Sequence, residues 1–138
     1  MNTVTRAQFV AEARTWLGTP YRHQGRLKGV AVDCIGLALC VARDVGISDF
    51  EFSGYQKRPD GTLKSHMDSK VEPVSFALAQ PADLILFQFN NCPMHVGILS
   101  ENWQVIHAYA PNRKVVEHRI DERLFSMVTG AYHIPGVV

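Results

Sequence analysis

The hydrophobic pattern of this chain changes its period along the sequence, and this change constrains the fold more than any other feature. Apolar residues recur at helical spacing in the first third, whereas the last third alternates as strands do. Helices that precede a meander of strands predict an α+β fold, with N-terminal helices packed on a C-terminal antiparallel sheet of about five strands. No repeat or long linker divides the chain, so residues 1–138 are expected to form a single domain.

Two helices are predicted in the first third. Thr5 is expected to cap the first, with Gln8 completing a capping box, and Gly18 and Pro20 are expected to stop it. The second is expected from about residue 34 to about residue 44. Its apolar residues lie nearly all round the helix, which predicts deep burial.

The rest of the chain is predicted as a turn-rich middle and a strand-rich end. Residues 47–80 contain turn signals at Gly54 and 59–61, and a short helix is indicated around Leu63 and Met67. The elements expected beyond this segment are strands over 84–89, 95–99, 104–109, 114–120 and 131–134, a helix over 122–127, and turns over 90–93 and 101–102.

The composition excludes several classes of protein. With 46% hydrophobic residues and a formal net charge of +1, the chain can bury a real core and has no strong electrostatic attraction for nucleic acid. No segment resembles a signal peptide or approaches the roughly 20 apolar residues that span a bilayer. We therefore expect a product made in the cytoplasm and not inserted into a membrane. Three cysteines, none in a CxxC spacing, do not suggest a disulfide framework.

Cys34 is the candidate nucleophile. It follows Asp33 at the predicted start of the buried helix, where free N–H groups and the helix dipole stabilise a thiolate. The thiolate is the reactive form, so we expect an ionised sulfur with a lowered pKa. Gly36 beside it predicts close approach of another segment or of substrate. A buried, unreactive cysteine is the alternative for Cys34, and we give that interpretation to Cys40 in the middle of the helix.

Two histidines on neighbouring predicted strands are candidates for the base and its partner. His95 opens one strand and His107 lies in the next, so pairing of these strands places both imidazoles on one face of the sheet. A lone strand histidine is usually a packing residue, but two that face a cysteine at a helix start favour a Cys–His–His relay. In that relay His95 deprotonates Cys34, and His107 orients His95. The histidines assigned to surface or packing are His66, His118 and His133.

Five short motifs give the chain a resemblance to a known family. The motifs, in order, are Leu17-Gly18-Thr19-Pro20-Tyr21, Val32-Asp33-Cys34-Ile35-Gly36-Leu37, Pro81-Ala82-Asp83-Leu84, His95-Val96-Gly97-Ile98 and Val105-Ile106-His107-Ala108. Over roughly residues 10–120 they resemble the NlpC-type cell-wall peptidases. In the sequence of residues 21–25 and in its short length, the chain is most similar to the phage-tail and prophage branch of that family.

The resemblance implies a papain-like fold and hydrolysis of a peptide amide in the stem peptide of bacterial peptidoglycan, often between γ-D-glutamate and the diamino acid. Carried over to this sequence, Cys34 is the nucleophile, His95 the base and His107 the third, orienting residue. The family implies no metal and no cofactor. The branch implies association with a virion or phage tail, with tail-tip proteins as candidate partners and the cell wall or periplasm as the place of action.

Three further residues are expected at the substrate. Tyr21 matches a family tyrosine whose hydroxyl can help to hold the oxyanion, with simple packing after the first helix as the alternative. Asp33 matches an aspartate that can contact the substrate amine, or it is only the helix cap. His23, just beyond Tyr21, is the remaining histidine placed to touch substrate. Ile35 and Ala82 depart from the family serine and glycine, and Ile35 puts a preference for free N-terminal L-Ala in doubt.

Three alternative functions remain open from the sequence. Cys34, His95 and His107, with Cys92 close by, could bind zinc, although their spacing matches no common zinc motif. The chain could be an inactive structural part of a phage tail that has kept the fold. The same thiol chemistry could also act on another acyl substrate, as in an amidase or acyltransferase.

Overall fold

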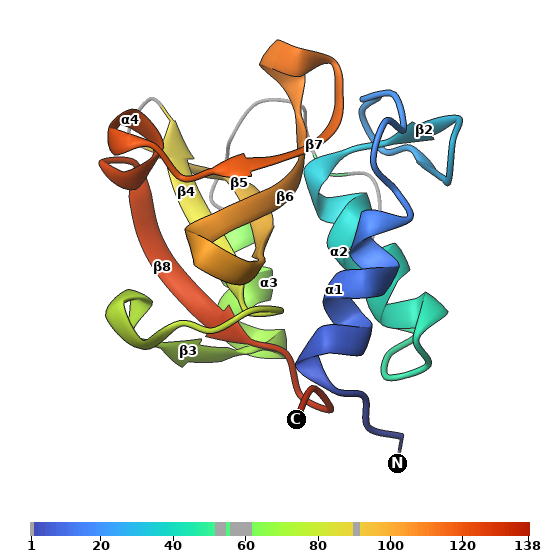
Figure 1. The fold of residues 1–138 in the computed structure, drawn as a ribbon, viewed down its shortest axis with the longest axis horizontal. Helices are drawn as coiled ribbons and strands as arrows, with labels where there is room; N and C mark the ends of the chain where they lie inside the picture. The colour runs from blue at the N-terminus through green and yellow to red at the C-terminus, as the bar shows by residue number, and fades with distance from the viewer. Residues whose placement is uncertain (1, 52–54, 56–61, 90–91) are drawn as a thin grey trace.

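Two helices lie side by side against one large curved sheet (Figure 1). The structure, a computed structural model, describes residues 2–51, 55, 62–89 and 92–138. Within these residues the α-helices are α1 (Arg6–Arg14), α2 (Cys34–Asp44), α3 (Thr62–Lys70) and α4 (Glu122–Phe125). The main antiparallel sheet has the order β3-β8-β4-β5-β6-β7 and contains β3 (Glu72–Val74), β4 (Leu84–Phe89), β5 (Cys92–Leu99), β6 (Gln104–Tyr109), β7 (Lys114–Arg119) and β8 (Val128–His133). A separate two-stranded sheet joins β1 (Arg26–Leu27) and β2 (Ala31–Val32).

The predicted α+β architecture and both N-terminal helices are confirmed. The Thr5 side chain accepts a bond from the Gln8 N–H at 3.0 Å, and Gln8 Oε1 accepts from the Thr5 N–H at 2.8 Å, which completes the capping box of α1. Helix α2 has the predicted bounds, and Asp33 caps it. The short helix indicated around Leu63 and Met67 is α3, and both residues turn inward to the core.

The sheet has six strands among the described residues, one more than predicted. The additional strand is β3, a short segment of the turn-rich middle with no alternation to reveal it, and it pairs with β8. Strand β8 begins at Val128, three residues earlier than expected. The turn predicted over 90–93 is wrong at Pro93. This residue lies in β5 and pairs with Gln88 of β4 beside a register shift, where a strand tolerates proline. The turn signals at Gly54, 59–61 and 90–91 lie outside the described residues.

Both faces of the main sheet are buried, which explains why β4 reads as an apolar run. Leu84 and Leu86 pack on the face that meets α1 and α2, whereas Ile85 and Phe87 belong to a second cluster on the opposite face. The side of β5 that faces α2 carries Val96 and Ile98, and the other side carries His95, Gly97 and Leu99. Within the described residues, no helix is both long and apolar enough to cross a membrane.

Candidate active site

Cys34 is the first residue of α2, and its sulfur lies near backbone N–H groups. The Asp33 carboxylate accepts the N–H of Gly36 at 2.7 Å and so fixes the first turn of the helix. The backbone N–H groups of Cys34, Ile35 and Val96 lie near the Cys34 sulfur and act to lower the pKa of its thiol. The nucleophile candidate therefore contacts β5 at the residue that follows His95.

The N–H of Val96 is available to the sulfur because two strands separate at this point. Strands β5 and β6 are paired only at Ile98–Ile106 and Leu99–Val105. Val96 lies two residues before Ile98, so its N–H points to the same side of β5, where the ladder with β6 has already ended. Helix α2 packs against both β5 and β6, and the Cys34 sulfur lies near this N–H.

His95 and His107 form a buried, hydrogen-bonded pair. His95 Nε2 lies 2.7 Å from His107 Nδ1, and the two side chains are 5% and 0% exposed. Gly97 makes this pairing possible, because a Cβ at residue 97 would lie 2.4 Å from Val105 Cγ2 and 3.3 Å from His107 Cβ. The two imidazoles share one face of the sheet, as the strand alternation indicates.

Aromatic rings enclose the histidine pair. Phe89 stacks on His95 with ring centroids 5.5 Å apart, and Tyr109 stacks on His107 at 4.5 Å. Phe87 lies 5.6 Å from His95 on the same face of the sheet. These rings hold both imidazoles in one orientation and remove water from them.

Burial controls the protonation of the site and changes one expectation. It raises the pKa of the Cys34 thiol to about 12, with the Asp33 carboxylate adding to the effect, although the nearby backbone N–H groups oppose it. Burial also lowers the pKa of His95 to about 3, and burial together with the neighbouring imidazoles lowers that of His107 to about 2. Burial therefore opposes the ionised resting thiolate expected from the helix start and favours a thiol beside a neutral imidazole.

A third histidine, assigned from the sequence to surface or packing, extends the pair. His118 on β7 places its Nε2 2.9 Å from His107 Nε2, and its Nδ1 lies 2.9 Å from the carbonyl oxygen of Arg119. The register of β6 and β7 pairs His107 with Val116, so His118 is the next residue on the same face. The alternation of Val116 and His118 in the sequence already contained this signal.

Asp33 is committed to bonds within the protein. Its carboxylate is 2% exposed and accepts the Gln24 N–H at 2.7 Å, a guanidinium N–H of Arg26 at 3.2 Å and the hydroxyl of Tyr55 at 2.5 Å, in addition to its cap bond. The cap interpretation is therefore confirmed, and an amine of the substrate would have to displace one of these donors. Tyr55 was not predicted, because it lies in the turn-rich middle segment where no periodicity marks it.

Tyr21 and His23 lie beside this cluster. Tyr21 packs against the core cluster that contains Cys34, and burial, together with the charges of Cys34 and Asp33, raises its pKa to about 12. One ring nitrogen of His23 lies 3.1 Å from the Tyr55 carbonyl oxygen and the other 3.9 Å from Asp33. The structure thus brings both residues to the Cys34 end of α2; contact with substrate remains a prediction for each.

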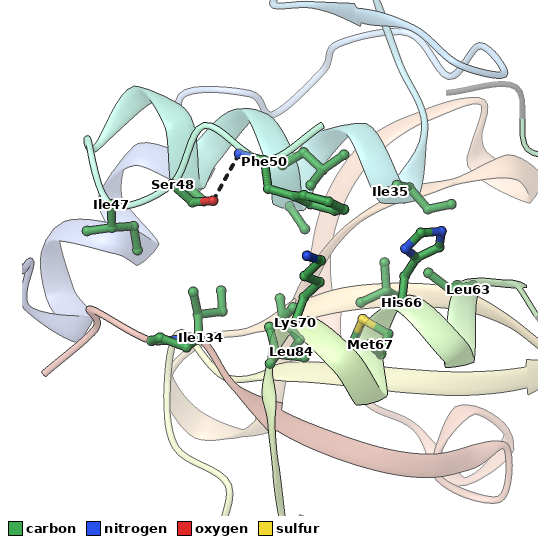
Figure 2. A pocket seen from close by; sticks show the side chains of 16 residues that line it. Ile35, Ile47, Ser48, Phe50, Leu63, His66, Met67, Lys70, Leu84 and Ile134 are labelled. Atoms are coloured by element: carbon green, nitrogen blue, oxygen red, sulfur yellow. Dashed lines mark hydrogen bonds between the residues drawn. The ribbon is translucent and has the colours of Figure 1, made fainter. Parts of the chain in front are cut away.

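A mostly apolar cavity of about 200 Å³ opens between α2 and α3 (Figure 2). Ile35 and Val96, the chain neighbours of Cys34 and His95, both reach its wall. His66 and Lys70 extend into it from α3, and the Lys70 ammonium lies 4.8 Å from the centre of the Phe50 ring. An isoleucine at the position of the family serine thus gives this cavity an apolar surface beside the nucleophile.

The zinc interpretation fails on the bonding of His107. Both of its ring nitrogens are engaged with other imidazoles, at 2.7 and 2.9 Å, so it has no free lone pair for a metal. Among the described residues, no group of three histidine, cysteine or acidic side chains is arranged to hold a metal ion. The side chain of Cys92 lies outside the described part of the chain.

Comparisons with known proteins found related folds and one family. The crystal structure of the NlpC/p60 domain of the peptidoglycan hydrolase SagA is similar with a TM-score of 0.72 and 25% identity, over 95% of this chain and 100% of that one. A Bacillus cereus NlpC/P60 family protein is similar with a TM-score of 0.75 and 21% identity, over 95% of this chain and 40% of that one. The peptidoglycan hydrolase RipB of Mycobacterium tuberculosis is similar with a TM-score of 0.65 and 21% identity, over 94% of this chain and 64% of that one. This chain thus spans less than two thirds of the latter two proteins. The comparison with curated protein sequences gave no match. The family model of NlpC/P60 matches residues 18–132, and the chain belongs to the NlpC/P60 family.

Proposed function

We propose that this protein is a cysteine endopeptidase that hydrolyses a peptide amide in the stem peptide of bacterial peptidoglycan. Membership of the NlpC/P60 family, whose solved relatives include peptidoglycan hydrolases, supports a cell-wall peptidase. The observation that carries the proposal is the buried His95–His107 pair together with Cys34 at the first position of α2, where its sulfur lies near the N–H of Val96, the residue after His95. A nucleophile, a base and an orienting group are the parts that acyl transfer by a thiol requires.

The resting protonation states define how the reaction starts. His107 occupies Nε2 of His95, so Nδ1 is the nitrogen available to take the thiol proton of Cys34. Because burial disfavours a free thiolate, this proton moves as sulfur attacks the carbonyl carbon of the substrate. The C=O bond electrons move to oxygen, and the backbone N–H of Cys34 and the hydroxyl of Tyr21 stabilise the oxyanion.

The second half of the reaction returns the site to its starting state. The C–N bond breaks, the leaving amine takes the proton from His95, and a thioester joins Cys34 to the acyl half of the substrate. Water then loses a proton to His95 and attacks the thioester carbonyl. The thiolate leaves, recovers that proton, and the acyl half departs as a carboxylic acid.

The finer assignment extends the proposal to the bond and the setting. The bond between γ-D-glutamate and the diamino acid is the target that the family resemblance supports. Ile35 and the apolar cavity beside it disfavour recognition of a charged N-terminal amine at that position. Resemblance to the phage-tail branch supports association with a virion and action in the cell wall or periplasm.

Mass spectrometry of digested peptidoglycan tests the proposal. The parent protein is expected to release fragments with new termini at one stem-peptide bond, and Cys34→Ala to release none. Cys40→Ala is the matched control, because Cys40 is also buried in α2 but lies away from the site, near Arg43. Equal cleavage by the parent and Cys34→Ala would refute the thiol mechanism. A folded parent that cleaves nothing would favour the inactive structural alternative.

A further inference from the structure

Three imidazoles form a hydrogen-bonded line from His95, the proposed base, toward the surface. His95 is bonded to His107, His107 to His118, and His118 to the carbonyl oxygen of Arg119. We propose that His118 is a positioning residue that fixes which nitrogen of His107 and of His95 carries a proton. The inference deepens the proposed function, because it concerns the base of that same reaction.

The carbonyl at the end of the line determines every proton position. A carbonyl oxygen only accepts, so Nδ1 of His118 must carry the proton of the bond to Arg119. A neutral His118 then has a bare Nε2, which accepts from Nε2–H of His107. His107 in turn accepts at Nδ1 from Nε2–H of His95, and this leaves Nδ1 of His95 as a lone pair. That lone pair is the group that a general base needs.

Without His118, either His95 or His107 could donate the proton of the hydrogen bond between them. His107 could then donate through Nδ1 to Nε2 of His95, and His95 would carry its proton on Nδ1, where it cannot act as a base. Burial favours neutral forms of His95 and His107 but does not select between their tautomers. The bond to His118 supplies that selection.

His118 also gives the line an exit toward water. His107 is fully buried and His95 nearly so, whereas His118 is half-buried at the outer end. A proton taken by His95 Nδ1 can be matched by transfer of Nε2–H from His95 to His107, and of Nε2–H from His107 to His118. His95 and His107 then each gain a proton on Nδ1 and lose one from Nε2, His118 gains one on Nε2, and the positive charge rests on the imidazole nearest to solvent. The ring of Tyr109 packs 6.1 Å from His118 and shields the inner part of the line.

Nitrogen-15 NMR of the histidine rings at pH 8 tests the assignment without any substrate. We expect the parent protein to carry protons on Nε2 of His95, Nε2 of His107 and Nδ1 of His118. In His118→Leu, which has no acceptor, signals of His95 and His107 should show a mixture of tautomers. In His118→Gln, whose amide oxygen can accept from His107, the parental pattern should return. A proton on Nδ1 of His95 in the parent at this pH would overturn the proposal.

Turnover of peptidoglycan provides the second readout. Loss of one orienting hydrogen bond predicts that kcat falls roughly tenfold in His118→Leu with KM little changed, and that His118→Gln recovers most of the loss. His133→Leu is the matched control, because His133 is also a half-buried strand histidine bonded to a carbonyl oxygen, that of Val137, but lies outside the line. Equal impairment of folded Leu and Gln variants would refute the acceptor role. If the parent cleaves no peptidoglycan, the proposed function fails, while the NMR result still decides the role of His118.

Discussion

Gly97→Ala tests whether the site depends on the close packing of Val105 and His107 against Gly97 of β5. The added Cβ would lie 2.4 Å from Val105 Cγ2, about 1 Å inside the shortest ordinary contact of 3.4 Å, and 3.3 Å from His107 Cβ. Val105 is fully buried and β-branched, so it cannot rotate away freely. Overpacking of this kind costs about 1–3 kcal/mol of stability.

The same substitution should reduce turnover more than its stability cost explains. A shift of His107 away from the new methyl group stretches the 2.7 Å bond to His95. We expect the melting temperature to fall by roughly 3–10 °C, from about 3 °C per kcal/mol for a chain of this size. We also expect kcat to fall at least ~10-fold at a temperature where the variant is fully folded. Thermal denaturation followed by circular dichroism and a peptidoglycan turnover assay measure the two effects.

Two companion variants make this test decisive. Gly130→Ala adds a methyl group to another strand glycine, whose Cβ would have an ordinary 3.4 Å contact with Tyr132, and should be neutral or slightly stabilising. Gly97→Ala combined with Val105→Ala removes the clashing atom, so the double variant should be more stable than the sum of the two single effects by about 1–2 kcal/mol. Parental stability and turnover in Gly97→Ala alone would refute the packing argument.

Three further predictions concern the buried titratable groups. His95 and His107 have pKa values far below the unfolded value of about 6.5, so the unfolded chain binds protons first as the pH falls. The free energy of unfolding should therefore fall by about 2 kcal/mol per imidazole from pH 7 to pH 5. Urea denaturation should show this slope, and the double variant His95→Gln/His107→Gln should show a flatter one. Cys34 should react with iodoacetamide very slowly at pH 6 and faster as the pH rises, and rapid labelling at pH 6 by peptide mass would contradict its raised pKa. Asp33→Ala should lower the free energy of unfolding by about 1–3 kcal/mol, because it removes the cap of α2 and strands its buried donors; an unchanged urea midpoint would oppose this.

The parts of the site that the sequence predicted are those fixed by local rules. The capped start of α2 follows from Asp33 and an apolar helix, and the shared face of His95 and His107 follows from the two-residue repeat of strands. His118 obeys the same repeat on the next strand, so the signal was present but was not extended from β6 to β7.

The parts that the sequence did not predict depend on contacts between distant segments. Tyr55 reaches Asp33 across 22 residues from a segment without periodicity, and β3 becomes a strand only by pairing with the far end of the chain. The expected ionisation of Cys34 also depends on such contacts. A helix start is a local feature that lowers a thiol pKa, whereas burial is set by β5, β6 and Tyr21, which the helix sequence does not contain.

Burial is the shared cause of the perturbed pKa values, and it decides how charge can develop in this site. A lone thiolate or a lone imidazolium would lose most of its hydration, so burial disfavours both forms at rest. When both form together, their attraction acts at low dielectric and offsets much of that loss. Attack on a substrate carbonyl then transfers the negative charge from sulfur to an oxygen that N–H groups can hold, while the histidine line moves the positive charge outward. Bound substrate therefore stabilises the ion pair. Cys34 should be more reactive when an acyl group is bound than in the free enzyme.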